Sequence, residues 1–178
     1  PASGSTSTPP NPTSPPPKVD TQGPRVGAEV LADRDFDILR GRSVGAIVNQ
    51  TSLIRTDHND TMRLVDALAA TPQIDLRALF APEHGIDGLL AAGEPLTDSV
   101  DAATGVAVFS LYGSTRRPTA AMFEGLDAVV FDLQDVGSRS YTYISTMGLA
   151  MQTAAATGTT FVVLDRPNPL GGELVSGF

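Results

Sequence analysis

The sequence predicts an α/β fold built on a parallel sheet of about five strands. Five short, almost continuously apolar runs recur along the chain, which is the pattern of strands buried on both faces. Segments with helical spacing lie between several of these runs. Strands that alternate with helices form right-handed βαβ units, so the strands should run in parallel. The expected strands cover residues 43–50, 75–81, 106–113, 127–135 and 160–166.

Three segments have the features of helices. Residues 60–70 place Met62 and Val65 on one helical face. Residues 118–125 begin with proline and end with glycine, the residues favoured at a helix start and just past a helix end. Residues 141–158 are long enough for about four turns and also end at a glycine.

The N-terminal segment has a different composition from the rest of the chain. Residues 1–17 contain fourteen Pro, Ser or Thr and no charged side chain. Such segments favour extended conformations and are typical of exposed stalks. We interpret residues 1–24 as a disordered linker and residues 25–178 as the folded domain, and we expect an extracytoplasmic protein that is secreted, periplasmic or anchored at the cell surface. A disordered end without a function is the alternative.

Composition excludes several classes of protein. The formal net charge is −8 and the 12 Lys and Arg are scattered, whereas nucleic-acid binding needs a basic patch, so we expect no nucleic-acid partner. No apolar run is long enough to span a bilayer. The chain has no Cys, no dinucleotide-binding glycine fingerprint and no P-loop, and we therefore expect no cofactor.

Polar side chains follow the predicted strands at the points where the apolar runs end. Because the carboxyl ends of parallel strands meet at one edge of a sheet, these side chains should line a common pocket. The start of the longest predicted helix adds an arginine and two tyrosines, which suit carboxylate binding and sugar stacking. For Asn49, Asp135 and Asn168, a role in a turn or helix cap is equally consistent. The expected pocket residues are Asn49, Glu83, His84, Asp132, Gln134, Arg139, Tyr141, Asp165, Arg166 and Asn168.

Glu83 stands out because "FAPEHGIDG" interrupts an apolar strand with a carboxylate and an imidazole. A carboxyl group in a partly apolar niche can act as a general acid, and glycoside hydrolysis is the main reaction class that needs one. The alternative is that Glu83 and His84 form a hydrogen-bonded cap that orders the next loop. That loop, residues 85–105, is long enough to be a lid, and we expect Asp98 and Asp101 in it to be solvated.

The motifs "LFAPEHGIDG", "VFSLYG", "VVFDLQDVGSRSYTYISTM" and "FVVLDRPNPLGG" occur in this order from about Gly41 to the last residue. In them the chain resembles the exo-β-N-acetylmuramidase family typified by NamZ. The resemblance implies a Rossmann-like catalytic domain, truncated here before a smaller C-terminal auxiliary domain. A further domain or a second chain would then complete the cleft.

The same resemblance implies a function and the residues that carry it. The family removes N-acetylmuramic acid from the non-reducing ends of peptidoglycan fragments, and Glu83 takes the place of its catalytic glutamate. The pocket residues named above fall on family motif positions, except Asn49, which we place in the pocket from its strand end alone. Two alternatives remain open: a non-catalytic domain that binds muropeptide sugars, and a metal-dependent hydrolase that uses Glu83, Asp132 and Asp135.

Overall fold

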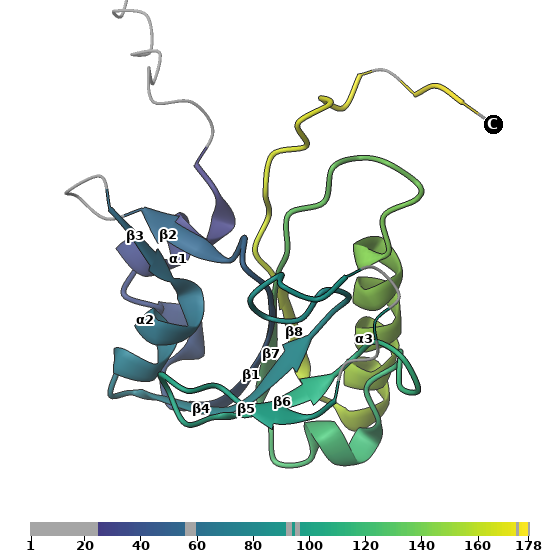
Figure 1. Cartoon of the computed structure of the whole chain (residues 1–178). Helices are drawn as coiled ribbons and strands as arrows, with labels where there is room; N and C mark the ends of the chain where they lie inside the picture. Colours follow the sequence, from purple (N-terminus) through teal and green to yellow (C-terminus); the bar gives the residue numbers. More distant parts are fainter. Residues whose placement is uncertain (1–24, 56–59, 92–93, 95–96, 174, 178) are drawn as a thin grey trace, which may run out of the picture.

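The computed structural model of the chain describes residues 25–55, 60–91, 94, 97–173 and 175–177 (Figure 1). The expected linker, residues 1–24, lies outside these ranges. The described part forms an α/β fold whose main sheet has six strands, and a separate two-stranded sheet lies beside it. None of the helices in the described ranges is long and apolar enough to cross a membrane.

The main sheet confirms the predicted strands and their parallel direction. The strand order is β5-β6-β4-β1-β7-β8, and every neighbouring pair is parallel except β5 and β6. The antiparallel edge strand β5 was not predicted. The strands are β1 (Arg42–Val48), β4 (Ile74–Ala81), β5 (Ser99–Val100), β6 (Ala107–Ser110), β7 (Ala128–Asp132) and β8 (Thr160–Val163).

Helices cover both faces of the sheet (Figure 1). Helices α1 (Gly27–Asp33) and α2 (Leu64–Ala70) lie on one face, and α3 (Tyr143–Thr157) lies on the other. The described ranges also contain two 3-10 turns, η1 (Asp37–Leu39) and η2 (Ala120–Phe123).

The predicted helix boundaries need two corrections. The expected helix 60–70 begins only at Leu64, because residues 61–63 form strand β3 (Thr61–Arg63), which pairs antiparallel with β2 (Leu53–Arg55). The expected helix 118–125 is the single 3-10 turn η2. The longest helix, α3, agrees with its prediction, and Gly158 ends it in the left-handed conformation.

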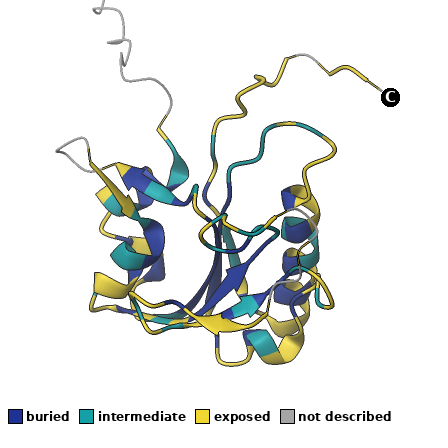
Figure 2. Ribbon diagram, viewed as in Figure 1, coloured by how far each residue is buried: buried dark blue, intermediate teal, exposed yellow. Residues whose placement is uncertain are grey.

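The two faces of the central strands form two separate apolar cores (Figure 2). Val44 of β1 faces α1 and α2, whereas Phe80 of β4 and Val129 of β7 face α3. Gly45 of β1 makes room for Phe80, because a Cβ atom at this position would lie 2.9 Å from the Phe80 ring. Such a distance is too short for any larger residue, so Gly45 allows the aromatic core to pack closely.

Strand β8 departs from the expected burial on both faces. Val163 is 48% exposed, and none of the four residues of β8 is fully buried. The strand forms the edge of the sheet, where only β7 pairs with it. The apolar run therefore predicted the strand correctly, but it did not predict that the strand lies at the exposed edge of the sheet.

Asp101 corrects the expectation that the acidic side chains of the long loop are solvated. Arg63 Nη1 donates to Asp101 Oδ1 at 2.8 Å, and the Asp101 side chain is only 7% exposed. Hydrogen bonds from Arg63 and from Thr104 lower the pKa of Asp101 to about 2. The contact ties the loop to β3. Asp98 is exposed, as expected, and accepts a hydrogen bond from the backbone N–H of Ser110 at 2.8 Å.

We expect Asp101→Asn to destabilise the protein at neutral pH by on the order of 2 kcal/mol. The carboxylate has a lower pKa in the folded state than its ordinary 3.8, so its stabilising effect is present above about pH 4 and is lost as the pH falls towards 2. Urea unfolding at several pH values measures this difference. The difference in the free energy of unfolding between wild type and variant should decrease on acidification. A difference that stays constant down to pH 2 would show that the charge of Asp101 does not stabilise the fold.

Candidate functional site

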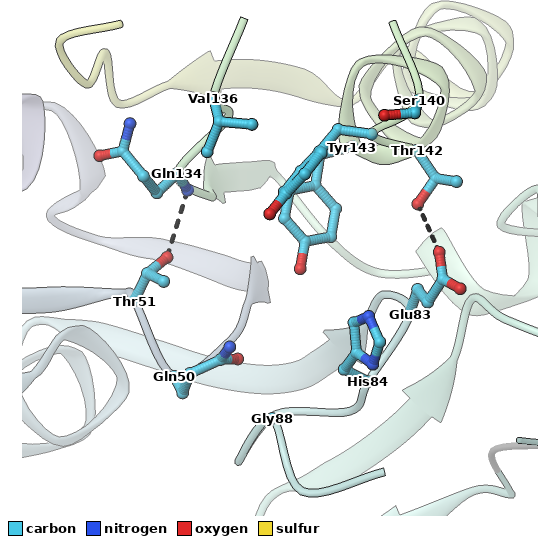
Figure 3. Close-up of a pocket in the computed structure, with 11 residues that line it drawn as sticks. Gln50, Thr51, Glu83, His84, Gly88, Gln134, Val136, Ser140, Thr142 and Tyr143 are labelled. Carbon is cyan, nitrogen blue, oxygen red and sulfur yellow. Dashed lines mark hydrogen bonds between the residues drawn. The ribbon is translucent and has the colours of Figure 1, made fainter. Parts of the chain in front are cut away.

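A pocket of about 550 Å³ opens at the carboxyl edge of the main sheet (Figure 3). It lies where β1, β4 and β7 end and where α3 begins. This is the position that open parallel sheets use for ligands, and the volume suits a small organic ligand. The lining residues are Gln50, Thr51, Glu83, His84, Gly88, Gln134, Val136, Ser140, Tyr141, Thr142 and Tyr143.

The turn after β4 brings Glu83 and His84 into this pocket. His84 has a φ of 73° and Gly85 a φ of 78°, and Gly85 N–H closes the turn on Pro82 O at 3.0 Å. A left-handed conformation is uncommon for a residue other than glycine and marks strained or functional positions. The strand thus ends abruptly and presents two side chains at the sheet edge.

Each of these two side chains has its own partner. Thr142 Oγ1 donates a hydrogen bond to Glu83 Oε2 at 3.0 Å, which links the carboxylate to the start of α3. His84 Nδ1 lies 2.8 Å from the backbone oxygen of Leu90, and a carbonyl can only accept, so Nδ1 carries a proton. His84 therefore orders the loop that follows it, as the alternative interpretation proposed. Glu83 instead lines the pocket.

The opposite wall comes from the ends of β1 and β7 (Figure 3). Thr51 Oγ1 accepts a hydrogen bond from Gln134 N–H at 3.2 Å, which joins the two strand ends. The Gln50 amide lies over Gly88, where a Cβ atom would lie 2.4 Å from the amide carbon. Gly88 also has a φ of 69°, so backbone conformation and space both favour glycine here.

Two tyrosines at the start of α3 form the wall between these sides. The rings of Tyr141 and Tyr143 meet edge to face with centroids 5.8 Å apart. Tyr141 is 42% exposed, whereas Tyr143 is buried and accepts a hydrogen bond from Asn49 Nδ2 at 3.1 Å. Burial is the main factor that raises the pKa of Tyr143, and the neighbouring charge of Glu83 adds to it. The phenol therefore stays protonated at neutral pH.

Asp132 and Arg166 lie outside this pocket and bind each other. Arg166 Nε and Nη2 donate to the two carboxylate oxygens of Asp132 at 2.6 and 2.8 Å. Asp132 is completely buried, and the Arg166 side chain is 9% exposed. Burial raises the pKa of Asp132, and Arg166 opposes that rise. The pair joins the ends of β7 and β8.

The remaining predicted residues lie around the pocket. Asn49 is 4% exposed and stands behind the wall, where its Oδ1 accepts from Thr51 N–H. Asp165 lines a smaller neighbouring cavity of about 200 Å³ between β8 and α3. Asn168 packs against Gly137 and bonds Leu170 N–H, as a turn residue does. Arg139 is exposed on the segment that precedes α3.

The acidic side chains do not gather as a metal site within the described ranges. No group of three or more His, Asp or Glu side chains there could hold an ion. Of Glu83, Asp132 and Asp135, only Glu83 lines the pocket. The two oxygens of Asp132 are bound by Arg166.

Sequence reasoning left out several lining residues that the structure places in the pocket. Ser140 and Thr142 directly flank the predicted Tyr141, and Gly88 and Val136 also line the pocket. Gln50, Thr51 and Tyr143 were recognised as polar residues at a strand end or helix start, but they were not among the expected pocket residues. Their adjacency to predicted residues was the available signal. Which side chains of a turn point inwards depends on backbone geometry that spacing does not give.

These features define the class of the protein as an α/β domain with a polar pocket at the carboxyl edge of its sheet and one carboxylate in the pocket wall. The chain belongs to the family described as "Exo-beta-N-acetylmuramidase NamZ, N-terminal", whose model matches residues 44–178. The predicted family is thereby confirmed.

Three known proteins show the extent of the similarity. The Peptidoglycan beta-N-acetylmuramidase NamZ of Bacillus subtilis (strain 168) is 42% identical over 167 residues, which are 94% of this chain and 38% of that protein. A DUF1343 family protein from Bacteroides fragilis has a crystal structure with a TM-score of 0.74 and 44% identity, over 85% of this chain and 38% of its own. A second DUF1343 family protein from Bacteroides fragilis has a crystal structure with a TM-score of 0.63 and 32% identity, over 81% of this chain and 35% of its own. The chain thus spans little more than a third of the relatives that it matches.

Proposed function

We propose that this chain forms the part of an exo-acting glycoside hydrolase that carries its catalytic acid, and that the enzyme releases N-acetylmuramic acid from the non-reducing ends of peptidoglycan fragments during cell-wall turnover. Family membership and the 42% identical Bacillus subtilis relative, named as a peptidoglycan β-N-acetylmuramidase, support the reaction class. The observation that carries the assignment of the site is that Glu83 is the only carboxylate among the described lining residues of the pocket.

In the proposed mechanism Glu83 donates a proton to the glycosidic oxygen as the bond to the muramyl sugar breaks. The hydroxyl of Thr142 holds one oxygen of the carboxyl group at 3.0 Å and leaves the other for the substrate. The exposed face of Tyr141 offers a surface on which a sugar ring can stack. His84, Gln134 and Gln50 supply hydrogen-bonding groups around the ring.

No second carboxylate lies among the described residues that line the pocket. Most glycoside hydrolases use two carboxyl groups, and some use the 2-acetamido group of the substrate instead. Either that acetamido group assists, or a carboxylate arrives from a further domain or a second chain that completes the cleft. The comparisons leave room for such a domain, because the chain spans only 38% of the Bacillus subtilis relative.

The lactyl carboxylate of the muramyl sugar needs a cationic partner. Arg166 is committed to Asp132 through two short hydrogen bonds. We propose Arg139, which is exposed on the segment before α3, as this partner, since a guanidinium group can bind a carboxylate through two parallel hydrogen bonds. We further propose an extracytoplasmic location, which rests on the composition of residues 1–24 and on the proposed cell-wall substrate.

Incubation of the protein, together with any further domain that completes the cleft, with a synthetic N-acetylmuramyl-N-acetylglucosamine disaccharide tests the proposal. Mass spectrometry should detect free N-acetylmuramic acid, while N,N′-diacetylchitobiose, which lacks the lactyl group, should remain intact. Binding of the disaccharide without release, measured by calorimetry, would support the alternative of a sugar-binding domain. Absence of both binding and release would contradict the proposed function.

A further inference from the structure

The hydroxyl of Tyr143 sits in a hydrogen-bonding arrangement that the proposed reaction does not use. Tyr143 is the first residue of α3, lines the pocket and is 7% exposed. Its hydroxyl oxygen lies 3.1 Å from Nδ2 of Asn49, a residue at the end of β1 that is 4% exposed. Which of the two groups donates decides where the phenolic proton points.

The neighbours of Asn49 fix the direction of this hydrogen bond. Asn49 Oδ1 accepts from Thr51 N–H at 2.9 Å and from Thr51 Oγ1 at 2.7 Å. A backbone N–H can only donate, so this atom must be the amide oxygen, and the atom that faces Tyr143 must be the NH₂ group. That group only donates, and the phenolic oxygen therefore accepts. No described residue accepts the proton of Tyr143 in turn, so the proton is available to a ligand in the pocket.

We propose that the Tyr143 hydroxyl donates a hydrogen bond to the acetamido carbonyl oxygen of bound N-acetylmuramic acid, and that Asn49 is the positioning residue that holds the hydroxyl for this bond. The inference rests on the proposed function, which supplies the substrate class. It adds a residue that selects N-acetylated sugars over sugars without that carbonyl group.

The charges around Tyr143 select a neutral acceptor. Burial is the main cause of the raised pKa of Tyr143, and the neighbouring Tyr141, Glu83 and Asp135 add to it. A charged acceptor such as the lactyl carboxylate would be repelled by the neighbouring carboxylate of Asp135, whereas an amide carbonyl carries no net charge. The acetamido carbonyl is an uncharged acceptor of this kind, and it is the one that we assign to the Tyr143 hydroxyl.

Tyr143→Phe tests the inference because it removes only the hydroxyl and keeps the ring against Tyr141. Calorimetry would compare binding of N-acetylmuramic acid with binding of its N-thioacetyl analogue, whose sulfur is a weaker acceptor. We expect Tyr143→Phe to weaken binding of the N-acetyl sugar about 3- to 10-fold and to abolish the preference of the wild type for it. Tyr112→Phe removes a phenolic oxygen outside the pocket and is the matched control. An unchanged affinity, or a preference that persists, overturns the inference.

Asn49→Asp provides a second variant that reverses the critical hydrogen bond. The carboxylate can still accept from Thr51 N–H, but it also accepts the proton of Tyr143 and withdraws it from the ligand. We expect the same loss of affinity as in Tyr143→Phe, and no further loss in the double variant. Losses that multiply in the double variant show that the two residues act separately and overturn the positioning role.

The outcomes separate this inference from the function on which it rests. If the wild type binds N-acetylmuramic acid or releases it from the disaccharide, and both variants bind as well as the wild type, only the inference is wrong. If the wild type neither binds nor releases the sugar, the proposed function fails and the inference fails with it. Thermal unfolding of each variant identifies any loss that comes from misfolding.

Discussion

Replacing Glu83 by glutamine is expected to lower kcat for disaccharide cleavage about 10²- to 10⁴-fold while the affinity for the substrate changes little. The amide has nearly the shape of the carboxyl group and can still accept the hydrogen bond from Thr142 Oγ1. It cannot deliver a proton to the departing oxygen. Release of N-acetylmuramic acid from the synthetic disaccharide measures the effect.

The leaving group provides a sharper test of the role of Glu83. An aryl glycoside of N-acetylmuramic acid has an acidic leaving phenol that needs little protonation, so Glu83→Gln should cleave it with a much smaller loss than the disaccharide. A general loss of structure would reduce both activities equally. The matched control is Glu124→Gln, which changes an exposed glutamate at the end of η2 and should leave both rates unchanged. Wild-type turnover of the disaccharide by Glu83→Gln would contradict the assignment.

The sequence predicted the parts of the fold that depend on local pattern. The central strands were recognisable because they are apolar on both faces, and the turn after β4 because Pro82 and Gly85 flank Glu83 and His84. The short strand β3 could not be recognised, because three residues directly before a helix are too few to show the alternating apolar and polar pattern of a strand. Helix α1 depends on a contact between distant parts of the chain, in which Gly27 N–H bonds Asp165 O at 2.7 Å after β8.

The candidate site likewise contains residues that local pattern predicts and residues whose contacts depend on distant parts of the chain. The structure brings Glu83, His84 and Gln134 together at the strand ends, and Tyr141 joins them from the start of α3. It could not show that Asp132 and Arg166 bind each other, because the partners are 34 residues apart and meet only when β7 and β8 pair. Likewise nothing in the spacing of Arg63 and Asp101 indicates their contact. Polar residues at strand ends are therefore a mixture of groups that line the pocket and structural pairs, and burial separates the two kinds.

The buried pair of Asp132 and Arg166 should dominate the stability of the site. We expect Arg166→Leu to reduce the free energy of unfolding at neutral pH by about 3–5 kcal/mol, because it leaves a completely buried carboxylate without a partner. Replacing both residues with apolar ones should restore much of this loss, since the cost comes from the uncompensated charge rather than from the missing contact. Urea unfolding measures each variant.

The pH dependence of the Arg166→Leu variant distinguishes this explanation from a packing defect. Burial raises the pKa of Asp132 and Arg166 alone opposes it, so without Arg166 the folded-state pKa rises further above that of the unfolded chain. A group with a raised folded-state pKa favours the folded state at low pH and disfavours it as the pH rises, so the deficit of the variant should shrink on acidification. The exposed pair of Arg34 and Asp37 is the matched control, and Arg34→Leu should cost no more than about 1 kcal/mol. A deficit in Arg166→Leu that is small, or that is independent of pH, would show that Asp132 is not held as a buried charge.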